Sequence, residues 1–508
     1  MLVERSRLIA LIGLCGASAA VLAASAGVLA PKPARAEAAG GACAALTAPG
    51  LFPQTTVASA VAIAADAGKH APAYCEVTAV ISPAPGSKIG VVYRLPEGWN
   101  GKLLGLGGGG WAGNVRIESA WQGLTRGYAT AQTDGGHNGP SVWDTSWAAN
   151  PESASDFAWR AIHLMTVVGK DVVSRYYGHA EAKAYYQGCS TGGRMGLMEV
   201  QRFPEDYDAV IAGAPVYNLL VQTSAVVRNQ LFNAPGAGFT ADQLAMVNKA
   251  VLDACDAQDG AADGILADPA KCGWDPAALQ CKTGQTGPSC LTEPQVNALR
   301  AAYRGVQTMD GRTAAWPLAK GGEAGWSRFM SINGASQDAT NGGGMGSLGK
   351  IITGDPGFDV AKFDPGSDLS RIRASSFAKE YEASDPAIGA FIRHGGKLLL
   401  WHGWSDPGPS PFGTIRYFQQ VQGTAPGADE SVKLFLAPGV YHCGGGPGPD
   451  QIDLLGALDD WARTGHAPAT LLATKVGAKI SRPLCPYPAM PYYKGSGDQD
   501  AASSFECR

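Results

Sequence analysis

The sequence carries little charge for its length. Of its 508 residues, 17% are charged, and the formal net charge is −4 with a pI near 6.1. A nucleic-acid-binding domain is expected to show clustered Lys and Arg and a pI above about 9. The composition therefore gives no indication of a nucleic-acid partner.

The sequence also lacks any C-x-x-C pair. Its 11 cysteines stand at irregular spacings, whereas structural zinc sites group cysteines about two to four residues apart. A zinc site built from cysteines is therefore not expected. Without Cys15, which lies in the N-terminal segment, ten cysteines remain, and an even number in an exported chain indicates disulfides.

Beyond the N-terminus, no segment is long and apolar enough to span a membrane. Residues 1–36 have the pattern of a signal peptide. Arg5 and Arg7 precede an Ala-rich apolar run (8–30), and the sequence ARA (34–36) offers small residues for cleavage. A membrane anchor is the alternative, although Ala and Gly dilute the run. We expect a periplasmic or secreted protein that is free of the membrane after cleavage.

Short apolar runs that suit buried strands recur in the first half of the chain and return near its end. Between two of them, residues 156–178 carry apolar side chains at helical spacing and end at Gly178. Strands that alternate with helices indicate a parallel sheet with crossover helices. The expected strands are 88–95, 102–107, 128–133, 184–188, 209–215, 396–403 and 432–439.

The intervening segment differs in composition. It is rich in Gly, Asp and Thr, contains short helical pieces and carries four closely grouped cysteines. We therefore expect an α/β catalytic domain over 37–216 and 387–508, interrupted by an inserted lid domain over 217–386.

A candidate nucleophile stands in the sequence GCSTG (188–192), which matches G-x-S-x-G. The motif follows an expected strand and precedes a helical stretch, which is the setting of a nucleophile elbow with Ser190 at its tip. The helix N-terminus would direct N–H groups at a developing oxyanion. In so Gly-rich a chain the motif alone is a weak signal, and a Gly-rich loop is the alternative.

A nucleophilic serine needs a base, and the base needs an orienting acid. In α/β-hydrolases the serine, the acid and the histidine follow in that order, each on a loop after a strand. Asp406 and His442 fit the second and third places. Of the eight histidines, four precede Ser190, two more precede Asp406, and His466 follows a helix. The alternatives are a turn acid before Pro407 and a loop histidine.

Two cysteines adjoin these candidates. Cys189 precedes Ser190, and Cys443 follows His442. If the serine and the histidine lie within hydrogen-bond distance, the neighbouring Cα atoms can fall within disulfide range. We therefore predict a Cys189–Cys443 bridge. A reactive free thiol is the alternative, which an oxidising compartment disfavours.

The oxyanion donors should come from two segments. The N–H of Thr191, directly after the nucleophile, is one expected donor. The second should come from the glycine loop GLGGGGWAGN (105–114), where Gly109 and Gly110 are both candidates. A flexible turn is the alternative interpretation of this loop.

The inserted segment contains an acidic loop, CDAQDGAADGILADP (255–269). Carboxylates placed so close together repel one another unless a cation compensates, and oxygen ligands in a flexible loop suit Ca²⁺. The spacing is not that of an EF-hand, and a solvated acidic turn is the alternative. The acidic residues are Asp256, Asp259, Asp263 and Asp268.

Taken together, GCSTGGRMG, WHGWSDP and YHCGGGPGP resemble motifs of the tannase and feruloyl esterase family of α/β-hydrolases. DFAWRAIH and GGGGWAG resemble the family too, and the resemblance extends from Cys43 to Cys507. It implies the α/β-hydrolase fold, a Ser–His–Asp triad linked through a disulfide, and hydrolysis of esters of aromatic acids such as ferulate, coumarate or gallate. The family also includes an enzyme that cleaves the mono-ester of terephthalate.

The resemblance further implies a structural Ca²⁺ ion in the lid. Its ligands would be the side chains of Asp256, Asp259 and Asp263 and the carbonyls of Ala261 and Ile265. It also implies, together with proximity in the sequence, the pairs Cys43–Cys75, Cys255–Cys272, Cys281–Cys290 and Cys485–Cys507.

We therefore predict an exported serine carboxylic-ester hydrolase, most similar to feruloyl esterases, that acts on small aromatic esters. Tannase activity and hydrolysis of a terephthalate mono-ester are alternatives, and the latter would need a cation such as Arg312 or Arg328 in the lid. Aromatic lid residues (Trp316, Trp326 and Phe329) are candidates for stacking on the substrate. A serine peptidase and a catalytically inactive binding protein on this fold are further alternatives; the intact triad argues against the second.

Overall fold

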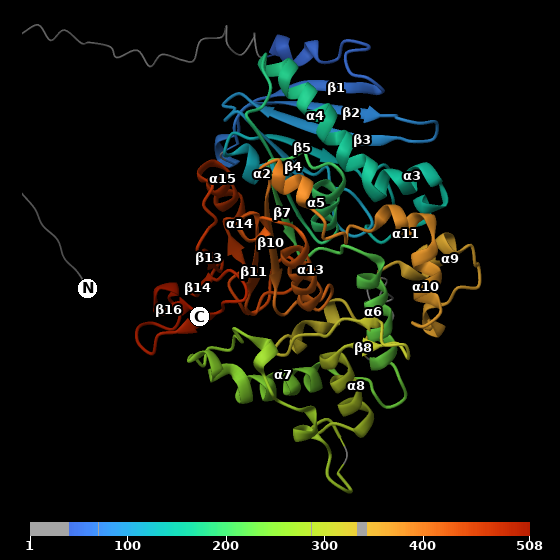
Figure 1. Ribbon diagram of the computed structural model, residues 1–508, viewed down its shortest axis with the longest axis vertical. Helices are drawn as coiled ribbons and strands as arrows, with labels where there is room; N and C mark the ends of the chain where they lie inside the picture. Colours follow the sequence, from blue (N-terminus) through green and yellow to red (C-terminus); the bar gives the residue numbers. More distant parts are fainter. Residues whose placement is uncertain (1–39, 70, 286, 333–342) are drawn as a thin grey trace, which may run out of the picture.

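The computed structural model describes residues 40–508 except 70, 286 and 333–342, so the predicted signal peptide lies outside the described residues. A nine-stranded sheet with the order β1-β2-β3-β5-β4-β6-β7-β10-β11 forms its centre (Figure 1). The strands are β1 (Thr55–Ile63), β2 (Tyr74–Ile81), β3 (Ile89–Pro96), β4 (Lys102–Leu106), β5 (Ala129–Thr133), β6 (Lys183–Cys189), β7 (Ala209–Gly213), β10 (Lys397–Gly403) and β11 (Val432–Ala437).

The sheet is mostly parallel. The run from β5 through β4, β6, β7 and β10 to β11 is parallel, whereas β1, β2 and β3 pair antiparallel at one edge. All seven strands expected from the sequence are present. β1 and β2 were not expected; β1 lies at the edge and alternates exposed with half-buried residues, so it lacks an apolar run.

Helices cover both faces of the sheet, and each face has its own apolar cluster. α4 and α5 pack on one face together with α13, and α2 and α15 pack on the other. The predicted helix 156–178 is present as a π-helical turn (Asp156–Arg160) that continues into α4. These helices are α2 (Ile117–Leu124), α4 (Ala161–Tyr177), α5 (Thr191–Arg202), α13 (Pro411–Thr424) and α15 (Leu454–Thr464).

The segment between β7 and β10 is largely helical and packs in two parts. Apolar residues between Phe232 and Ile332 form a separate cluster below the sheet, whereas α9, α10 and α11 contribute to the same cluster as the sheet and lie beside α3 (Figure 1). The boundaries of an independent lid stay a prediction. The helices are α6 (Leu219–Phe232), α7 (Ala241–Cys255), α8 (Glu293–Arg304), α9 (Met345–Thr353), α10 (Asp368–Ala374), α11 (Ser376–Tyr381) and α12 (Gly389–Arg393).

Short elements complete the fold. Three small sheets lie outside the central one: β8 with β9, β12 with β13 and β14, and β15 with β16. The elements are α3 (Pro151–Ser155), α14 (Ala428–Ser431), β8 (Val306–Gln307), β9 (Thr313–Ala315), β12 (Gln451–Ile452), β13 (Leu471–Thr474), β14 (Ser481–Leu484), β15 (Pro491–Tyr493) and β16 (Phe505–Cys507).

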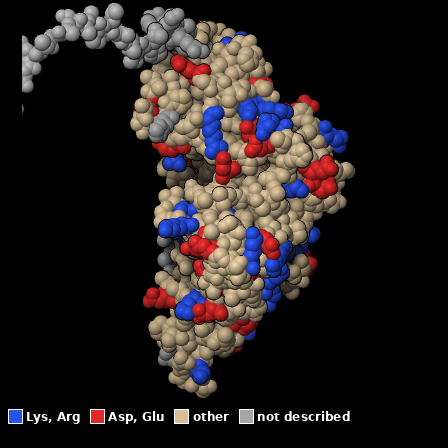
Figure 2. Space-filling model, turned by 90° about the vertical axis from the view of Figure 1, so that its left-hand side faces the viewer, with Lys and Arg blue, Asp and Glu red and all other residues tan. Residues whose placement is uncertain are grey.

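The surface reflects the low charge of the sequence. On the face drawn in Figure 2, Lys and Arg are interspersed with Asp and Glu and do not form a continuous positive area. None of the helices in the described part of the chain has the length and apolarity needed to cross a bilayer.

Candidate active site

Ser190 lies at the sharp turn between β6 and α5. Its φ of +62° is in the left-handed region, and its N–H donates to the carbonyl of Gly213 over 2.9 Å. The turn leaves no room at Gly188, where a Cβ would come within 2.5 Å of the backbone of Gly192. The glycines of the motif therefore permit the strained turn that exposes the serine.

Asp406 follows β10 and His442 follows β11, two neighbouring parallel strands. The Nδ1 atom of His442 lies 2.7 Å from Oδ2 of Asp406. Neither Ser190 Oγ nor His442 Nε2 makes a hydrogen bond within the described residues. The hydrogen bond between Ser190 and His442 is therefore not formed in this structure, and both atoms are free to meet a substrate. Hydrogen bonds between catalytic residues often form only when a substrate binds.

The Asp406 carboxylate is fully buried and well supplied with donors. His402 Nε2 lies 3.1 Å from its Oδ2, and the N–H of Gly408 donates to its Oδ1 over 2.8 Å. Burial raises the pKa of Asp406, but His442 and His402 outweigh it and lower this pKa to about 2. An ionised Asp406 therefore faces His442 at any ordinary pH.

Two residues that the sequence analysis did not place at the site hold the loop after β10, which carries Asp406. The fully buried His402 also contacts the Thr414 hydroxyl over 2.8 Å. Arg228 of α6 is buried and donates to the carbonyl of Gly408 over 2.7 Å. Burial lowers the pKa of Arg228 to about 10, against the opposing effect of the Asp406 charge. The Arg228 contact joins segments 180 residues apart, so the sequence could not reveal it. His402 lies only four residues before Asp406, but nothing in the strand pattern indicates that its ring reaches the acid.

A disulfide joins the nucleophile turn to the histidine loop. Cys189 and Cys443 are bonded, with their Cα atoms 6.0 Å apart and a separation of 254 positions in the sequence. Ser190 and His442, each next to one of these cysteines, both line one cavity. The structure also contains the four other expected pairs: Cys43–Cys75, Cys255–Cys272, Cys281–Cys290 and Cys485–Cys507.

The cavity has a volume of about 380 Å³. Beyond Ser190 and His442, its walls are mostly apolar and include Trp143, Val221 and Phe329. The Phe329 ring meets the His442 ring edge-on, with centroids 5.0 Å apart. No Lys, Arg, Asp or Glu lines the cavity among the residues that the structure describes.

The predicted oxyanion residues Thr191, Gly109 and Gly110 all line this cavity. The N–H of Gly109 is engaged with the carbonyl of Ala112 over 3.1 Å. No acceptor is present for the N–H groups of Thr191 or Gly110 within the described residues. Gly110 has a φ of +61°, and a Cβ there would come within 2.5 Å of the Val142 carbonyl oxygen. The geometry thus favours Gly110 over Gly109 as the second donor.

The lid side chains that the sequence suggested lie in different places. Phe329 lines the cavity, but Trp326 is only 1% exposed and packs in the separate apolar cluster. Arg312 is bonded to Asp310, and Arg328 lies over the ring of Tyr441 at 5.0 Å. Neither Trp316 nor either arginine is among the residues that line the cavity. Trp143, which the sequence analysis did not single out, does line it.

The acidic loop holds Asp256, Asp259 and Asp263 close enough to influence one another electrostatically, but their carboxylate oxygens do not all lie within 4.8 Å of one another. Asp259 is 7% exposed, and burial, followed by repulsion from Asp263 and Asp256, raises its pKa to about 6 despite a backbone hydrogen bond. One cation, Arg482 of β14, pairs with Asp263. Three carboxylates therefore share a single positive charge.

The backbone of the loop adds oxygen atoms. Ala261 and Ile265 are both buried, and their carbonyl groups accept no hydrogen bond within the described part of the chain. A donor set of carboxylates and carbonyls fits a hard cation such as Ca²⁺. The loop lies between Cys255 and Cys272, which are bonded to each other, and none of its residues lines the cavity.

Comparison with known proteins identifies this arrangement. The model of the family described as tannase and feruloyl esterase matches residues 75–508. The mono(2-hydroxyethyl) terephthalate hydrolase of Piscinibacter sakaiensis is 33% identical, over 86% of this chain and 85% of that protein. Feruloyl esterase B of Aspergillus niger is 32% identical, over 85% of this chain and 86% of that protein. The crystal structure of feruloyl esterase B from Aspergillus oryzae superimposes with a TM-score of 0.84 and 26% identity, over 92% of this chain and all of that one.

The family match covers most of the chain, and the mostly parallel sheet with flanking helices is the α/β-hydrolase fold that the sequence predicted. The chain belongs to the tannase and feruloyl esterase family and is a carboxylic ester hydrolase.

Proposed function

We propose that this protein is an exported serine esterase that hydrolyses esters of hydroxycinnamic acids. Ser190 attacks the ester carbonyl, His442 accepts the serine proton, and Asp406 holds the imidazole in place. The N–H groups of Thr191 and Gly110 stabilise the oxyanion. Water then hydrolyses the acyl-enzyme with His442 as the base.

One observation carries the choice of substrate: the candidate nucleophile opens into an apolar, partly aromatic cavity, and none of the described residues that line it is charged. A planar aromatic acyl group fits such walls and loses little by leaving water. A terephthalate mono-ester would place a free carboxylate in the same cavity, where no Lys or Arg of the described residues lines the wall. The absence of lining charge therefore favours a neutral aromatic acid.

A polar group in the cavity supports a phenolic ring. Gln222 of α6 lines the cavity, and its Nε2 donates to the Tyr381 hydroxyl over 3.2 Å. Its Oε1 is buried, and no described residue forms a hydrogen bond with it. A phenol of the substrate can donate to this oxygen and so satisfy it.

The five disulfides are typical of proteins in oxidising compartments. They support a periplasmic or secreted location, as does the signal-peptide pattern of residues 1–36. Ca²⁺, bound by the acidic loop, would neutralise Asp256, Asp259 and Asp263 and hold the loop folded.

A substrate screen tests the proposal. Methyl ferulate and methyl p-coumarate should give the largest kcat/KM, ahead of methyl gallate and mono(2-hydroxyethyl) terephthalate. Gln222→Leu should lower kcat/KM for methyl p-coumarate about tenfold and leave methyl cinnamate, which lacks the phenol, unchanged. A preference for the terephthalate ester, or turnover of an anilide at the rate of the matching ester, would refute it.

A further inference from the structure

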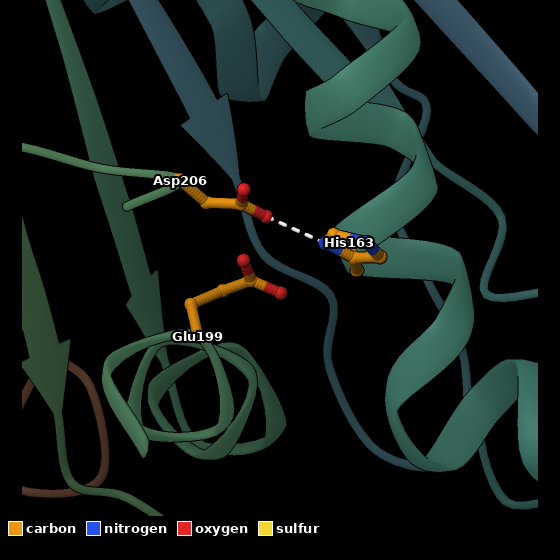
Figure 3. A group of neighbouring side chains, drawn as sticks. All are labelled: His163, Glu199 and Asp206. Carbon is orange, nitrogen blue, oxygen red and sulfur yellow. Dashed lines mark hydrogen bonds and ion pairs between the residues drawn. The ribbon is translucent and has the colours of Figure 1, made fainter. Parts of the chain in front are cut away.

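A second group of chemically capable side chains lies away from the cavity. Among the described residues, His163, Glu199 and Asp206 form the one group of three whose ligand atoms all lie within 4.8 Å of one another. His163 comes from α4, Glu199 from α5, and Asp206 from the turn after α5. Figure 3 shows their side chains pointing toward a common centre. None of the three lines the catalytic cavity.

Glu199 is the unusual member of this cluster. It is 1% exposed, and within the described part of the chain neither of its carboxylate oxygens has a hydrogen-bond partner. A buried carboxylate without donors is costly, by several kcal/mol at least, unless a proton or a cation compensates it. Its nearest acidic neighbour, Asp206, adds a second negative charge.

Among the described residues, no side chain forms an ion pair with Glu199, although the charge of Lys170 acts on it from a distance. Lys170 lies nearby, but its Nζ is 3.4 Å from the carbonyl of Glu205 and 4.0 Å from Oε1 of Glu181. His163 Nδ1 lies 2.7 Å from Asp206 Oδ2, so its hydrogen bond is directed to Asp206 and leaves Glu199 without a donor.

The cluster is also held in shape before any ligand arrives. The ring of His163 stacks on Phe203, with centroids 3.8 Å apart and 12° between the planes. This contact fixes the direction of Nδ1. The side chains of His163 and Asp206 are 23% and 14% exposed, so water can reach an ion at the centre.

We propose that His163, Glu199 and Asp206 bind a divalent cation of the zinc type. The ligands would be His163 Nδ1 and one oxygen from each carboxylate, with water in the fourth position; the Nδ1 proton that now meets Asp206 would leave to solvent, and the neutral ring would carry its proton on Nε2. Zn²⁺ is commonly held by such a mixture of imidazole and carboxylate ligands. Ca²⁺ takes oxygen ligands only and more of them, so it suits this cluster poorly.

The two carboxylates balance the charge of the ion. The bound ion would link α4 to α5. Helix α5 starts directly after Ser190 and supports the nucleophile turn. Its role would be structural, because the ligands do not contact the cavity.

Zinc binding to the untagged mature protein tests this site. The protein is stripped with a chelator, supplied with excess Ca²⁺ to fill the acidic loop, and dialysed against micromolar Zn²⁺. Bound zinc and thermal midpoint are then measured. Wild type should retain one zinc ion more than Glu199→Gln and than Asp206→Asn, and zinc should raise the midpoint of wild type alone. Glu205→Gln, which removes an exposed charge beside Asp206, is the matched control and should behave as wild type.

Circular dichroism of each variant establishes that it is folded. If either Glu199→Gln or Asp206→Asn does not fold, the other variant still tests the site. Anomalous scattering at the zinc edge should place the ion about 2.0–2.2 Å from the three side chains. Equal zinc content in wild type and both variants, or displacement of the zinc by Ca²⁺, would overturn the site. Glu199 would then hold a proton between its carboxyl group and that of Asp206.

Discussion

Two places in this molecule set an aspartate Oδ2 at 2.7 Å from a histidine Nδ1: Asp406 with His442, and Asp206 with His163. The pairs match in geometry but differ in their surroundings. Asp406 receives further hydrogen bonds from His402 and from a backbone N–H, and its pKa is lowered to about 2.

The second pair has an acid beside it instead of a donor. Burial, and then the charge of Asp206, raise the pKa of Glu199 well above its ordinary value. The same two residue types therefore produce an ionised acid that orients a base in one place and an uncompensated acidic cluster in the other. The neighbours of the pair, and not the pair itself, determine its role.

The largest expected effect separates the two aspartates directly. Asp406→Asn should lower kcat for an aromatic ester by about 10⁴-fold, because the amide no longer fixes His442 in the required tautomer. Asp206→Asn removes the same charge from the other pair and should leave kcat within about threefold. Steady-state rates at pH 7.5 measure both effects. A similar loss of kcat in both variants would show that the two aspartates do not differ in their roles.

The covalent link is the next difference between the two regions. His442 lies beside Cys443, which is bonded to Cys189 next to the nucleophile, whereas His163 and Asp206 adjoin no cysteine. The double variant Cys189→Ser, Cys443→Ser should lose roughly 2–5 kcal/mol of unfolding free energy, because the bridge closes a long loop. It should also lower kcat by at least about tenfold.

Denaturant unfolding and rate measurements check that expectation. The double variant Cys281→Ser, Cys290→Ser, which opens a disulfide that spans only nine residues in the inserted segment, is the control and should keep kcat. Full activity without the Cys189–Cys443 bridge would show that the triad needs no such constraint.

The donors around Asp406 sharpen the comparison further. His402→Leu removes one hydrogen bond to the acid and should lower kcat about tenfold with little change in KM. His179→Leu, at an exposed histidine, should leave both constants unchanged. An unaltered kcat for His402→Leu would mean that the remaining donors suffice.

The sequence predicted most of the central sheet and the main residues of the candidate active site. The apolar runs predicted seven strands of the central sheet, namely β3 to β7, β10 and β11. The strand–turn–helix motif, together with the order of the residues along the chain, selected Ser190, Asp406 and His442. The bonded pair Cys189–Cys443 was also predictable, because each cysteine adjoins a member of that group.

Contacts that depend on packing were not predictable. α5 is buried on all sides, including Met198, Glu199 and Val200 in succession, so no helical periodicity marks Glu199 as an interior residue. Arg228 and Trp143 reach the site from separate loops and helices and carry no motif. The return of α9–α11 to the sheet likewise depends on apolar surfaces that meet only in the folded chain.

The smallest effect concerns the pH dependence of stability. Because the folded-state pKa of Asp406 is about 2, below its ordinary 3.8, its ionisation stabilises the fold above pH 4, and this contribution is lost as the pH falls toward 2. The stability difference between wild type and Asp406→Asn should therefore be constant from pH 7 to 5 and shift by roughly 1–2 kcal/mol by pH 3. Thermal melts in matched buffers measure it, and a pH-independent difference would contradict the assigned environment.

The central claim is that Ser190 is the nucleophile and that the Cys189–Cys443 disulfide holds it near His442. Rapid quenching of the enzyme with methyl ferulate, followed by peptide mass spectrometry, tests it most directly. The account predicts a feruloyl group on the peptide that carries Ser190, absent from Ser190→Ala and accumulated in a variant that deacylates slowly. A feruloyl group on any other residue, or undiminished turnover by Ser190→Ala, would contradict it.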